Sequence, residues 1–245
     1  MLTQVEQAAR NNALWCDTVC RAHGIPGEFH DSVWLNRRQV PRFYPNAVTL
    51  SSTQGAAEQL THIQDLMAEA IPAGLAVKDS FYTLDLAPLE FRLLFEVTWL
   101  WRAPGVPKPD GAVAGIRWAT VQESPELAKW ETAWNGPLAG EQSTLPARVF
   151  LPALLTDRDI VFIAAYRDEQ IVAGAIANRT GDVVGLSNVF VLRNGTSRFW
   201  AGCVTAVMDA FPGLPLVGYE HGSELAIAQT LGFEELGPLR VWAQA

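Results

Sequence analysis

The sequence has no surplus of basic residues. Lys and Arg number 18 against 26 Asp and Glu in 245 residues, which gives a formal net charge of -8 at pH 7. A protein that binds nucleic acid over a broad surface needs a basic stripe to meet the phosphates. The acidic composition therefore argues against a nucleic-acid partner.

Long apolar runs are also missing. A helix that crosses a bilayer needs about 20 consecutive apolar residues, and no stretch of this sequence reaches that length. The first residues, MLTQVEQAAR, have neither the basic start nor the apolar core of a signal peptide. We therefore expect no membrane partner and a cytoplasmic location.

Cysteine is scarce, and its spacing does not suit a metal. Cys16 and Cys20 lie one helical turn apart, Cys203 stands alone, and the histidines are scattered along the chain. This pattern predicts small buried thiols in a reducing compartment and no metal site.

The composition that remains is that of a packed globular protein, with 49% hydrophobic and 10% aromatic residues. Its clearest boundary is the segment 103–115, APGVPKPDGAVAG, whose prolines and glycines cannot sustain a helix or a central strand. We interpret it as the joint between two halves, residues 1–105 and 116–245, with a linker at 106–115.

The second half has an orderly pattern. Ser124 as N-cap and Pro125 as first helical residue predict a helix towards Trp134, and a second helix is predicted over residues 147–155. Three apolar runs with short turns predict an antiparallel meander at 160–166, 171–178 and 183–191. A helix at 197–211, a strand at 214–219, a short helix between Ser223 and Gly232 and a strand at 239–242 follow. The predicted fold class is α/β (α+β), a mixed central sheet with helices on both faces.

The first half echoes the second at an offset of 142 residues. The matches are Asn36 with Asn178, Arg37 with Arg179, Asn46 with Asn188, Leu50 with Leu192, Leu89 with Leu231 and Phe91 with Phe233. The helical pattern from Ala56 to Ala70 falls on the helix predicted at 197–211. Chance is the alternative, but the ungapped register favours two related halves, of which the first lacks the opening strand and helix.

Four local sequences resemble the GNAT superfamily of acetyl-CoA-dependent N-acetyltransferases. They are GLSNVFV at 185–191, PLVGYE at 215–220, LGF at 231–233 and RVW at 240–242. The resemblance covers residues 116–245, with a truncated copy before it, and implies a GNAT-like mixed central sheet with acetyl-CoA as cofactor.

The resemblance also implies where the cofactor binds. The backbone of the strand would pair with pantetheine through Asn188, Val189, Phe190 and Val191. The following loop and helix N-terminus would meet the pyrophosphate through Arg193, Asn194, Gly195, Thr196 and Arg198. The loop departs from the family pattern, since Phe199 and Trp200 stand where small residues are usual. A plain polar turn is therefore the alternative interpretation.

The catalytic groups follow the strand at 214–219. Many relatives place a tyrosine acid four residues before the Gly-Phe pair, and that position is Ala228 here. The sequence offers Glu220 as base, directly or through water, His221 with a suitable pKa range, and Tyr219 as a substitute acid. The alternative is a solvated loop without chemistry.

Two further segments carry polar groups of interest. Trp34–Tyr44 interleaves aromatics with Arg37, Arg38 and Arg42, which suits an anionic ligand, although packed aromatics with solvent-facing arginines are favoured. The acids of Asp79–Asp85 suit either a site between the halves or the polar ends of a strand.

The sequence thus predicts transfer of an acetyl group from acetyl-CoA to the amine of a small molecule, held in a cleft between the halves. A homodimer is compatible with this function. The alternative is a non-catalytic GNAT-like binding or scaffold module that has lost the cofactor loop. A third hypothesis is a transferase for another acyl-CoA, with the aromatic first half shaping an acyl pocket.

Overall fold

A computed structural model describes residues 2–69, 71, 74–136, 147–192 and 195–244. The chain forms two compact units. The first comprises Met1–Leu100, Tyr219–Gly222 and Glu235–Ala245, and the second comprises Trp101–Gly218 and Ser223–Glu234. The final strand of the chain therefore belongs to the first unit.

The first unit is built on a mixed sheet. Its strands are β1 (Glu28–Phe29), β2 (Val33–Leu35), β3 (Ala47–Thr49), β4 (Ala76–Asp79), β5 (Phe91–Arg102) and β11 (Glu234–Gln244). They lie in the order β1-β2-β3-β4-β11-β5. β3 and β4 are parallel, whereas β11 is antiparallel to β4.

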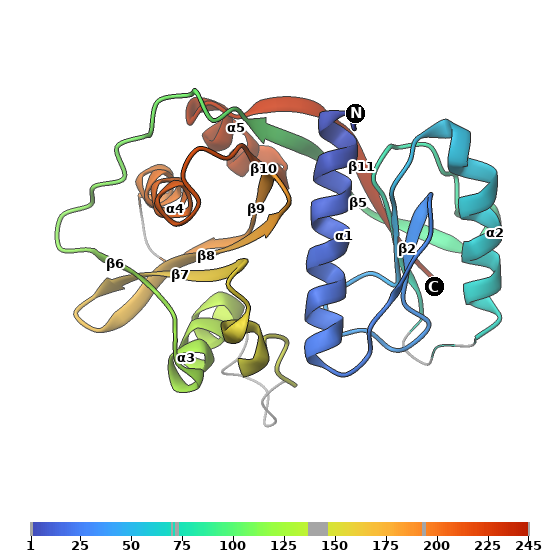
Figure 1. Cartoon of the computed structure of the whole chain (residues 1–245), viewed down its shortest axis with the longest axis horizontal. Coiled ribbons are helices and arrows are strands. Elements are labelled where there is room, and N and C mark those ends of the chain that lie inside the picture. The colour runs from blue at the N-terminus through green and yellow to red at the C-terminus, as the bar shows by residue number, and fades with distance from the viewer. Residues whose placement is uncertain (1, 70, 72–73, 137–146, 193–194, 245) are drawn as a thin grey trace. The chain divides into compact units, whose positions relative to one another are not determined.

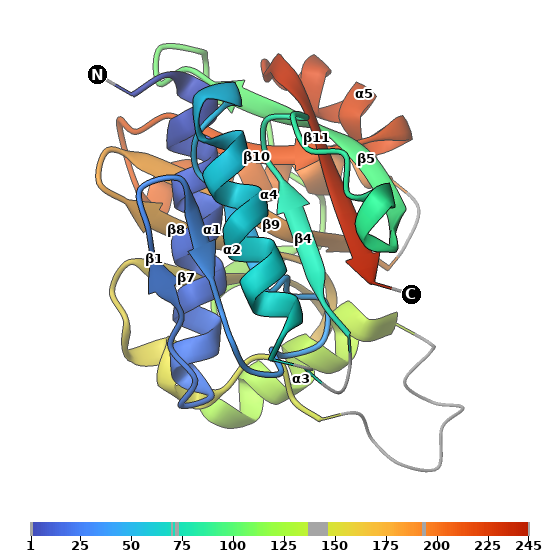
Figure 2. The ribbon, with the colours of Figure 1, turned by 90° about the vertical axis from the view of Figure 1, so that its right-hand side faces the viewer.

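Two helices lie on opposite faces of this sheet (Figures 1 and 2). α1 (Gln4–Ala22) begins at a capping box, in which Thr3 Oγ1 accepts from the Glu6 backbone N–H and the Glu6 carboxylate accepts from the Thr3 N–H. α2 (Ala56–Met67) follows a 3₁₀ turn at Thr53–Gly55 and places Ile63 and Leu66 in the apolar core with strands β2, β3 and β4. A second 3₁₀ turn, Ala87–Leu89, precedes β5. The predicted helical pattern is confirmed for residues 56–67, while Ala70 lies outside the described residues.

The second unit contains the predicted meander. Its strands are β6 (Arg117–Thr120), β7 (Ile160–Arg167), β8 (Gln170–Thr180), β9 (Val183–Val191) and β10 (Leu216–Glu220), in the order β6-β7-β8-β9-β10. Neighbours from β6 to β9 are antiparallel, whereas β10 runs parallel to β9 from the pair Leu216 and Val184. The sequence analysis missed β6, a four-residue strand directly after the Pro/Gly-rich segment.

Helices cover both faces of the second sheet. α3 (Ser124–Asn135) packs on one face and α4 (Thr196–Ala210) on the other, and α5 (Gly222–Thr230) leads to β11 (Figure 1). The predicted fold class, a mixed sheet with helices on both faces, is confirmed. The start of α3 differs by one residue, because Glu123 occupies the N-cap and Ser124 is already helical.

The helix predicted at 147–155 is wrong. The chain instead forms a 3₁₀ helix at Pro152–Thr156. The buried carboxylate of Glu131 accepts the backbone N–H of Val149 at 2.7 Å and that of Phe150 at 3.4 Å. These amides therefore bind a side chain rather than the carbonyls of a helical turn, and Pro152 has no N–H to donate.

The Pro/Gly-rich segment 103–115 has no helix or strand, as predicted, but it is bound to α4. Thr205 Oγ1 donates to the carbonyl of Pro109 at 2.9 Å, and Lys108 forms an ion pair with Asp209. A Cβ at Gly111 would lie 2.7 Å from the Cα of Gly202, so the two backbones touch. We name residues 107–111 the strap.

Several elements repeat at the predicted offset of 142 residues. β3 falls on the end of β9, α2 falls within α4, β4 overlaps β10, and β5 falls on β11. β3 and β4 form a parallel pair, as β9 and β10 do. α1 breaks the pattern, because its offset positions cover the 3₁₀ helix at 152–156 and the start of β7. An origin by duplication therefore stays a prediction.

Candidate functional site

β9 carries a bulge at the residues predicted to bind the cofactor. Its pairing with β8 shifts register around Ala175, which faces Asn188 and Val189 together. Asn188 adopts a left-handed conformation with φ of 53°. A bulge bends its strand and releases backbone groups from the ladder. Asn188 and Val189 therefore lie where β9 departs from regular sheet geometry, whereas Phe190 and Val191 pair with Gly174 and Ala173 of β8.

The side chain of Phe190 is partly buried and packs against the core. Its ring lies 5.1 Å from that of Trp130 in an edge-to-face arrangement, and Trp130 Nε1 donates to the carbonyl of Ile163 at 2.8 Å. A Cβ at Gly174 would lie 2.6 Å from Trp130 Nε1, so a glycine is needed beside this indole. The contact with Trp130 therefore holds the Phe190 ring against the core.

The first turn of α4 differs from that of the other described α-helices. α1, α2, α3 and α5 each carry an acid in the first turn: Glu6, Glu58, Glu126 and Glu224. α4 carries none and has no side-chain cap at Gly195, whose φ is 97°. Gly195, Ser197 and Arg198 are exposed. The positive end of this helix dipole is therefore open to an anion.

The two bulky residues that depart from the family loop pattern face inward. Phe199 is 2% exposed and packs with Ala165, Val172 and Ala173 of the sheet. Trp200 is also buried, at 4%. Gly202 on the same helix lies against the indole of Trp118, so its role is packing.

Tyr219 of β10 belongs to a buried polar cluster in the first unit. Its hydroxyl accepts a hydrogen bond of 3.0 Å from Lys78 Nζ, and Lys78 donates a second bond of 2.8 Å to Asn12 Oδ1. The ring of Trp99 meets that of Tyr219 edge-on at 5.4 Å, and Trp99 Nε1 donates to the carbonyl of Ser80 at 2.8 Å. Tyr219 itself belongs to the first unit, and the cluster therefore ties it to α1, β4 and β5 of the same unit.

The other two predicted catalytic residues have different surroundings. Glu220 is half-buried and ends β10, whereas His221 is exposed in the turn before α5. The structure therefore ties Tyr219 into a fixed network and leaves His221 in solvent, as a solvated loop would be. Sequence reasoning missed Lys78 and Asn12, although a lone lysine in the apolar stretch LAVKDS was a usable signal.

No protein-family model matches the chain, and no curated protein matches it. Solved structures do match over nearly the full length. A GCN5-related N-acetyltransferase from Kribbella flavida is 16% identical with a TM-score of 0.62, over 97% of this chain and 95% of that one. A GNAT-family protein from Novosphingobium aromaticivorans is 12% identical with a TM-score of 0.56, over 97% and 99%. A GCN5-related N-acetyltransferase-like protein from Streptococcus suis is 13% identical with a TM-score of 0.52, over 99% and 98%.

The chain has the GNAT fold. The resemblance drawn from β9, β10 and the LGF turn is thereby confirmed at the level of architecture. The position of the usual GNAT acid, Ala228, is fully buried in α5. Two residues of the GNAT-like cofactor loop, Arg193 and Asn194, lie outside the described residues.

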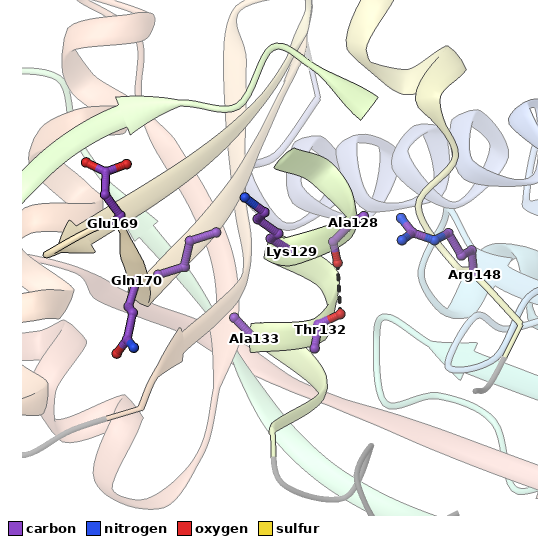
Figure 3. Close-up of a pocket in the computed structure, with 8 residues that line it drawn as sticks. Ala128, Lys129, Thr132, Ala133, Arg148, Glu169 and Gln170 are labelled. Atoms are coloured by element: carbon purple, nitrogen blue, oxygen red, sulfur yellow. Dashed lines mark hydrogen bonds between the residues drawn. The ribbon is translucent and has the colours of Figure 1, made fainter. Parts of the chain in front are cut away.

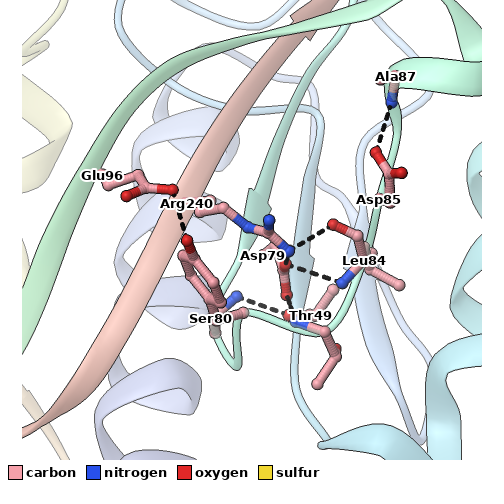
Figure 4. Close-up of polar contacts among 10 residues, drawn as sticks. Thr49, Asp79, Ser80, Leu84, Asp85, Ala87, Glu96 and Arg240 are labelled. Atoms are coloured by element: carbon pink, nitrogen blue, oxygen red, sulfur yellow. Dashed lines mark hydrogen bonds and ion pairs between the residues drawn. The ribbon is translucent and has the colours of Figure 1, made fainter.

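Asp79 and Asp85 accept backbone N–H groups of the turn segment that follows β4, so they are not the two polar ends of one strand. Asp79 is buried and accepts the N–H groups of Thr83 at 3.1 Å and Leu84 at 2.9 Å (Figure 4). Arg240 of β11 pairs with Asp79 at 3.2 Å. Asp85 accepts the N–H at the start of the 3₁₀ turn 87–89. The strand ends at Asp79, and the rest of 79–85 is turn or irregular chain.

In the arginine-rich segment 34–44, Trp34 and Tyr44 are buried and Arg38 and Arg42 are exposed, as the favoured interpretation predicted, whereas the exposed Phe43 departs from it. Trp34 is fully buried, and Arg37 forms an ion pair of 3.1 Å with Glu69. Arg42 stacks on the ring of Phe43 at 4.3 Å, and Phe43 is exposed. Arg37 is therefore paired with a carboxylate of this chain.

Each of the two units has a surface pocket. One of about 400 Å³ in the second unit is lined by Lys129 and Thr132 of α3 and by Glu169, Gln170 and Arg148 (Figure 3). Another of about 380 Å³ in the first unit is lined by residues that include Thr3, Glu6, Ser52 and Ser80. Neither pocket contains a residue of the GNAT-like cofactor loop or of the trio Tyr219–His221.

The cysteines are buried free thiols, as predicted. Burial raises the pKa of Cys16 to about 11 and that of Cys20 to about 12. In the described part of the chain, no group of three or more His, Cys, Asp or Glu side chains is arranged to hold a metal ion. Among the same residues, no helix is long and apolar enough to cross a membrane.

Proposed function

We propose that the protein transfers an acetyl group from acetyl-CoA to the amine of a small molecule. The observation that carries this proposal is the combination of the β9 bulge with the acid-free first turn of α4, on a GNAT fold. Bound acetyl-CoA would supply the activated acetyl thioester.

The chain offers suitable groups to hold this cofactor. The backbone of Asn188–Val191 would pair with the pantetheine arm, and the first turn of α4 would bind phosphate oxygens through its N–H groups and Arg198. Gly195 supports this, because a Cβ at this position would meet no atom within 4 Å and the residue is exposed. From the sequence alone, Arg193 and Asn194 would add donors to the same loop.

The chemistry needs a base for the amine and an acid for the departing sulfur. We assign the base to Glu220, which ends β10, and the acid to Tyr219, since Ala228 has no group to donate. His221 is exposed and would act as a proton relay to solvent rather than as the base.

A non-catalytic GNAT-like binding or scaffold module is the second candidate. Ala228 favours it, because the usual acid position carries a methyl group at full burial. The bulk of Phe199 does not favour it, because that side chain packs into the core against Ala173 and its neighbours.

Calorimetry and thermal denaturation with acetyl-CoA test the proposal. A ligand at ~100 times its dissociation constant should stabilise the fold by about 2.7 kcal/mol. Release of the free thiol in the presence of an amine panel then separates an enzyme from a binding module. A panel of longer acyl-CoA donors tests the third hypothesis. Absence of stabilisation at millimolar acetyl-CoA would exclude the enzyme, whereas binding without thiol release would favour the scaffold.

A further inference from the structure

Lys78 is a buried cation without an acidic partner. Its side chain belongs to a residue that is 5% exposed, and none of the ion pairs formed by the described residues includes it. Its two hydrogen-bond acceptors, Asn12 Oδ1 and the Tyr219 hydroxyl, are neutral. Burial of a charge is costly unless hydrogen bonds and opposite charges compensate it. The position of Lys78 therefore calls for an explanation beyond packing.

The thiol and the phenol near Lys78 supply no counter-charge. Cys16 lies one turn beyond Asn12 on α1, and burial raises the pKa of its thiol to about 11, which keeps it neutral at physiological pH. Burial likewise raises the pKa of Tyr44. The ammonium therefore faces dipoles and an aromatic ring, and it lies 4.4 Å from the centroid of Tyr219.

This contact fixes which role the Tyr219 hydroxyl can play. An ammonium donates hydrogen bonds and accepts none, so Lys78 must be the donor and the phenol oxygen the acceptor. The hydroxyl proton of Tyr219 is then left for a different partner. The edge-on ring of Trp99 and the bond from Trp99 to Ser80 hold the phenol in place.

We infer that Lys78 is a positioning residue that makes Tyr219 the proton donor of the transfer. This inference rests on the proposed function. Asn12 anchors the ammonium from α1, and the ammonium lies 3.0 Å from the oxygen that becomes negative when Tyr219 gives up its proton. The charge of Lys78 is thus compensated most strongly at the moment of proton transfer.

The step balances with groups of this chain. As the new C–N bond forms and the C–S bond breaks, Glu220 takes one proton from the amine nitrogen and Tyr219 gives one to the sulfur. Lys78 holds the phenolate until water returns a proton from Glu220 to Tyr219. The products are an amide and a free thiol, and the protein regains its starting protonation.

The hydrogen bond between Lys78 and Tyr219 can be tested without measuring activity. The sequence contains three lysines, Lys78, Lys108 and Lys129, so ¹⁵N spectra of the side-chain ammonium groups are simple. We expect one slowly exchanging ammonium signal, because Lys78 is buried and hydrogen-bonded. Lys78→Met should abolish this signal, Tyr219→Phe should shift or broaden it, and Lys108→Met, an exposed control, should leave it unchanged. An identical signal in the Tyr219→Phe protein would overturn the inference.

A comparison of two leaving groups tests whether Lys78 acts through proton donation by Tyr219. With ethanolamine as acceptor, Tyr219→Phe should slow thiol release from acetyl-CoA by ~100-fold, the lower end of the range of general acid catalysis. Lys78→Met should slow it by at least ~10-fold, a smaller loss because Lys78 acts through Tyr219. An aryl thioester, S-(4-nitrophenyl) thioacetate, releases a weakly basic thiolate that needs no acid. Both variants should therefore approach the wild-type rate with this donor, and Lys108→Met should match wild type with both donors.

The outcomes separate this inference from the proposed function. Equal losses with both thioesters would show that Lys78 is merely structural, while the acetyltransferase itself stands. If acetyl-CoA does not bind the wild type, the proposed function fails whatever the spectra show. Should Lys78→Met not fold, Lys78→Arg keeps the charge and the donor groups, and it should retain more of the acetyl-CoA rate than Tyr219→Phe. A rate for Lys78→Arg below that of Tyr219→Phe would contradict the inference.

Discussion

Gly202 of α4 lies so close to the indole of Trp118 that a Cβ at position 202 would sit 2.0 Å from Trp118 Cζ2. The same glycine touches the backbone of Gly111 in the strap. A glycine in the middle of a helix is unfavourable by itself, so close approach is the reason for this one. The strap, Trp118 and α4 therefore form one packed layer in the second unit.

Gly202→Ala should destabilise the fold by about 2 kcal/mol, because the added methyl group overpacks this layer. The sign of this change in the free energy of unfolding is informative, because helix propensity alone would favour alanine by about 1 kcal/mol. Urea denaturation measures the difference. Gly105→Ala is the control, since a Cβ there would meet no atom within 4 Å, and it should change stability by less than ~0.5 kcal/mol. A stabilised Gly202→Ala protein would contradict the packing.

Ser197→Glu should weaken acetyl-CoA binding about tenfold while raising fold stability by about 0.5 kcal/mol. The new carboxylate complements the dipole of α4, but it occupies and repels the phosphate position. Calorimetry measures the affinity, and thermal denaturation of the free protein measures the stability.

Gln4→Glu is the matched control, because it places the same acid in the exposed first turn of α1. It should change stability in the same direction and leave the affinity for acetyl-CoA unaltered. Unchanged affinity in the Ser197→Glu protein would argue against phosphate binding at α4.

The buried thiol of Cys16 should make the fold sensitive to alkaline pH. Its pKa is about 11 in the folded protein against 9.0 for an exposed thiol, so the folded state favours the neutral form. The resulting stabilisation is complete below pH 9 and is lost as the pH rises to 11, by about 2 to 3 kcal/mol.

Urea denaturation between pH 8.5 and 11 checks this effect. Cys16→Ala removes the titrating group, so its free energy of unfolding should fall less steeply with pH than that of wild type. Other groups titrate in both proteins, and the difference between the two slopes is therefore the quantity to compare. Parallel slopes would refute the role of Cys16.

Much of the second unit could be predicted from the sequence. β7, β8 and β9 follow from apolar runs with two-residue turns, and α4 follows from its apolar stripes, because short-range periodicity decides these elements. The helix expected at 147–155 failed because the Glu131 carboxylate, far away in sequence, captures the amides of Val149 and Phe150. A local pattern cannot reveal such a competitor.

Part of the candidate site could likewise be predicted from the sequence, and part of it could not. Glycine, polar residues and the absence of an acid after β9 are visible in the sequence, and they already single out the start of α4. The partners of Tyr219 are not visible in the sequence, because Asn12 and Lys78 lie more than a hundred residues away from it. The fold brings them to Tyr219 on α1 and β4.

By itself, the sequence determined the acidic charge that disfavours nucleic acid, the order of the elements in the second half, and the resemblance to GNAT proteins. Tertiary structure decided the rest. The Pro/Gly-rich segment contacts α4, and Phe199 packs in the core. Asp79 pairs with Arg240, and Lys78 is buried against Tyr219. The physical reason is that charge and periodicity are properties of neighbouring residues, whereas the cost of burying a polar group depends on which distant groups the fold places beside it.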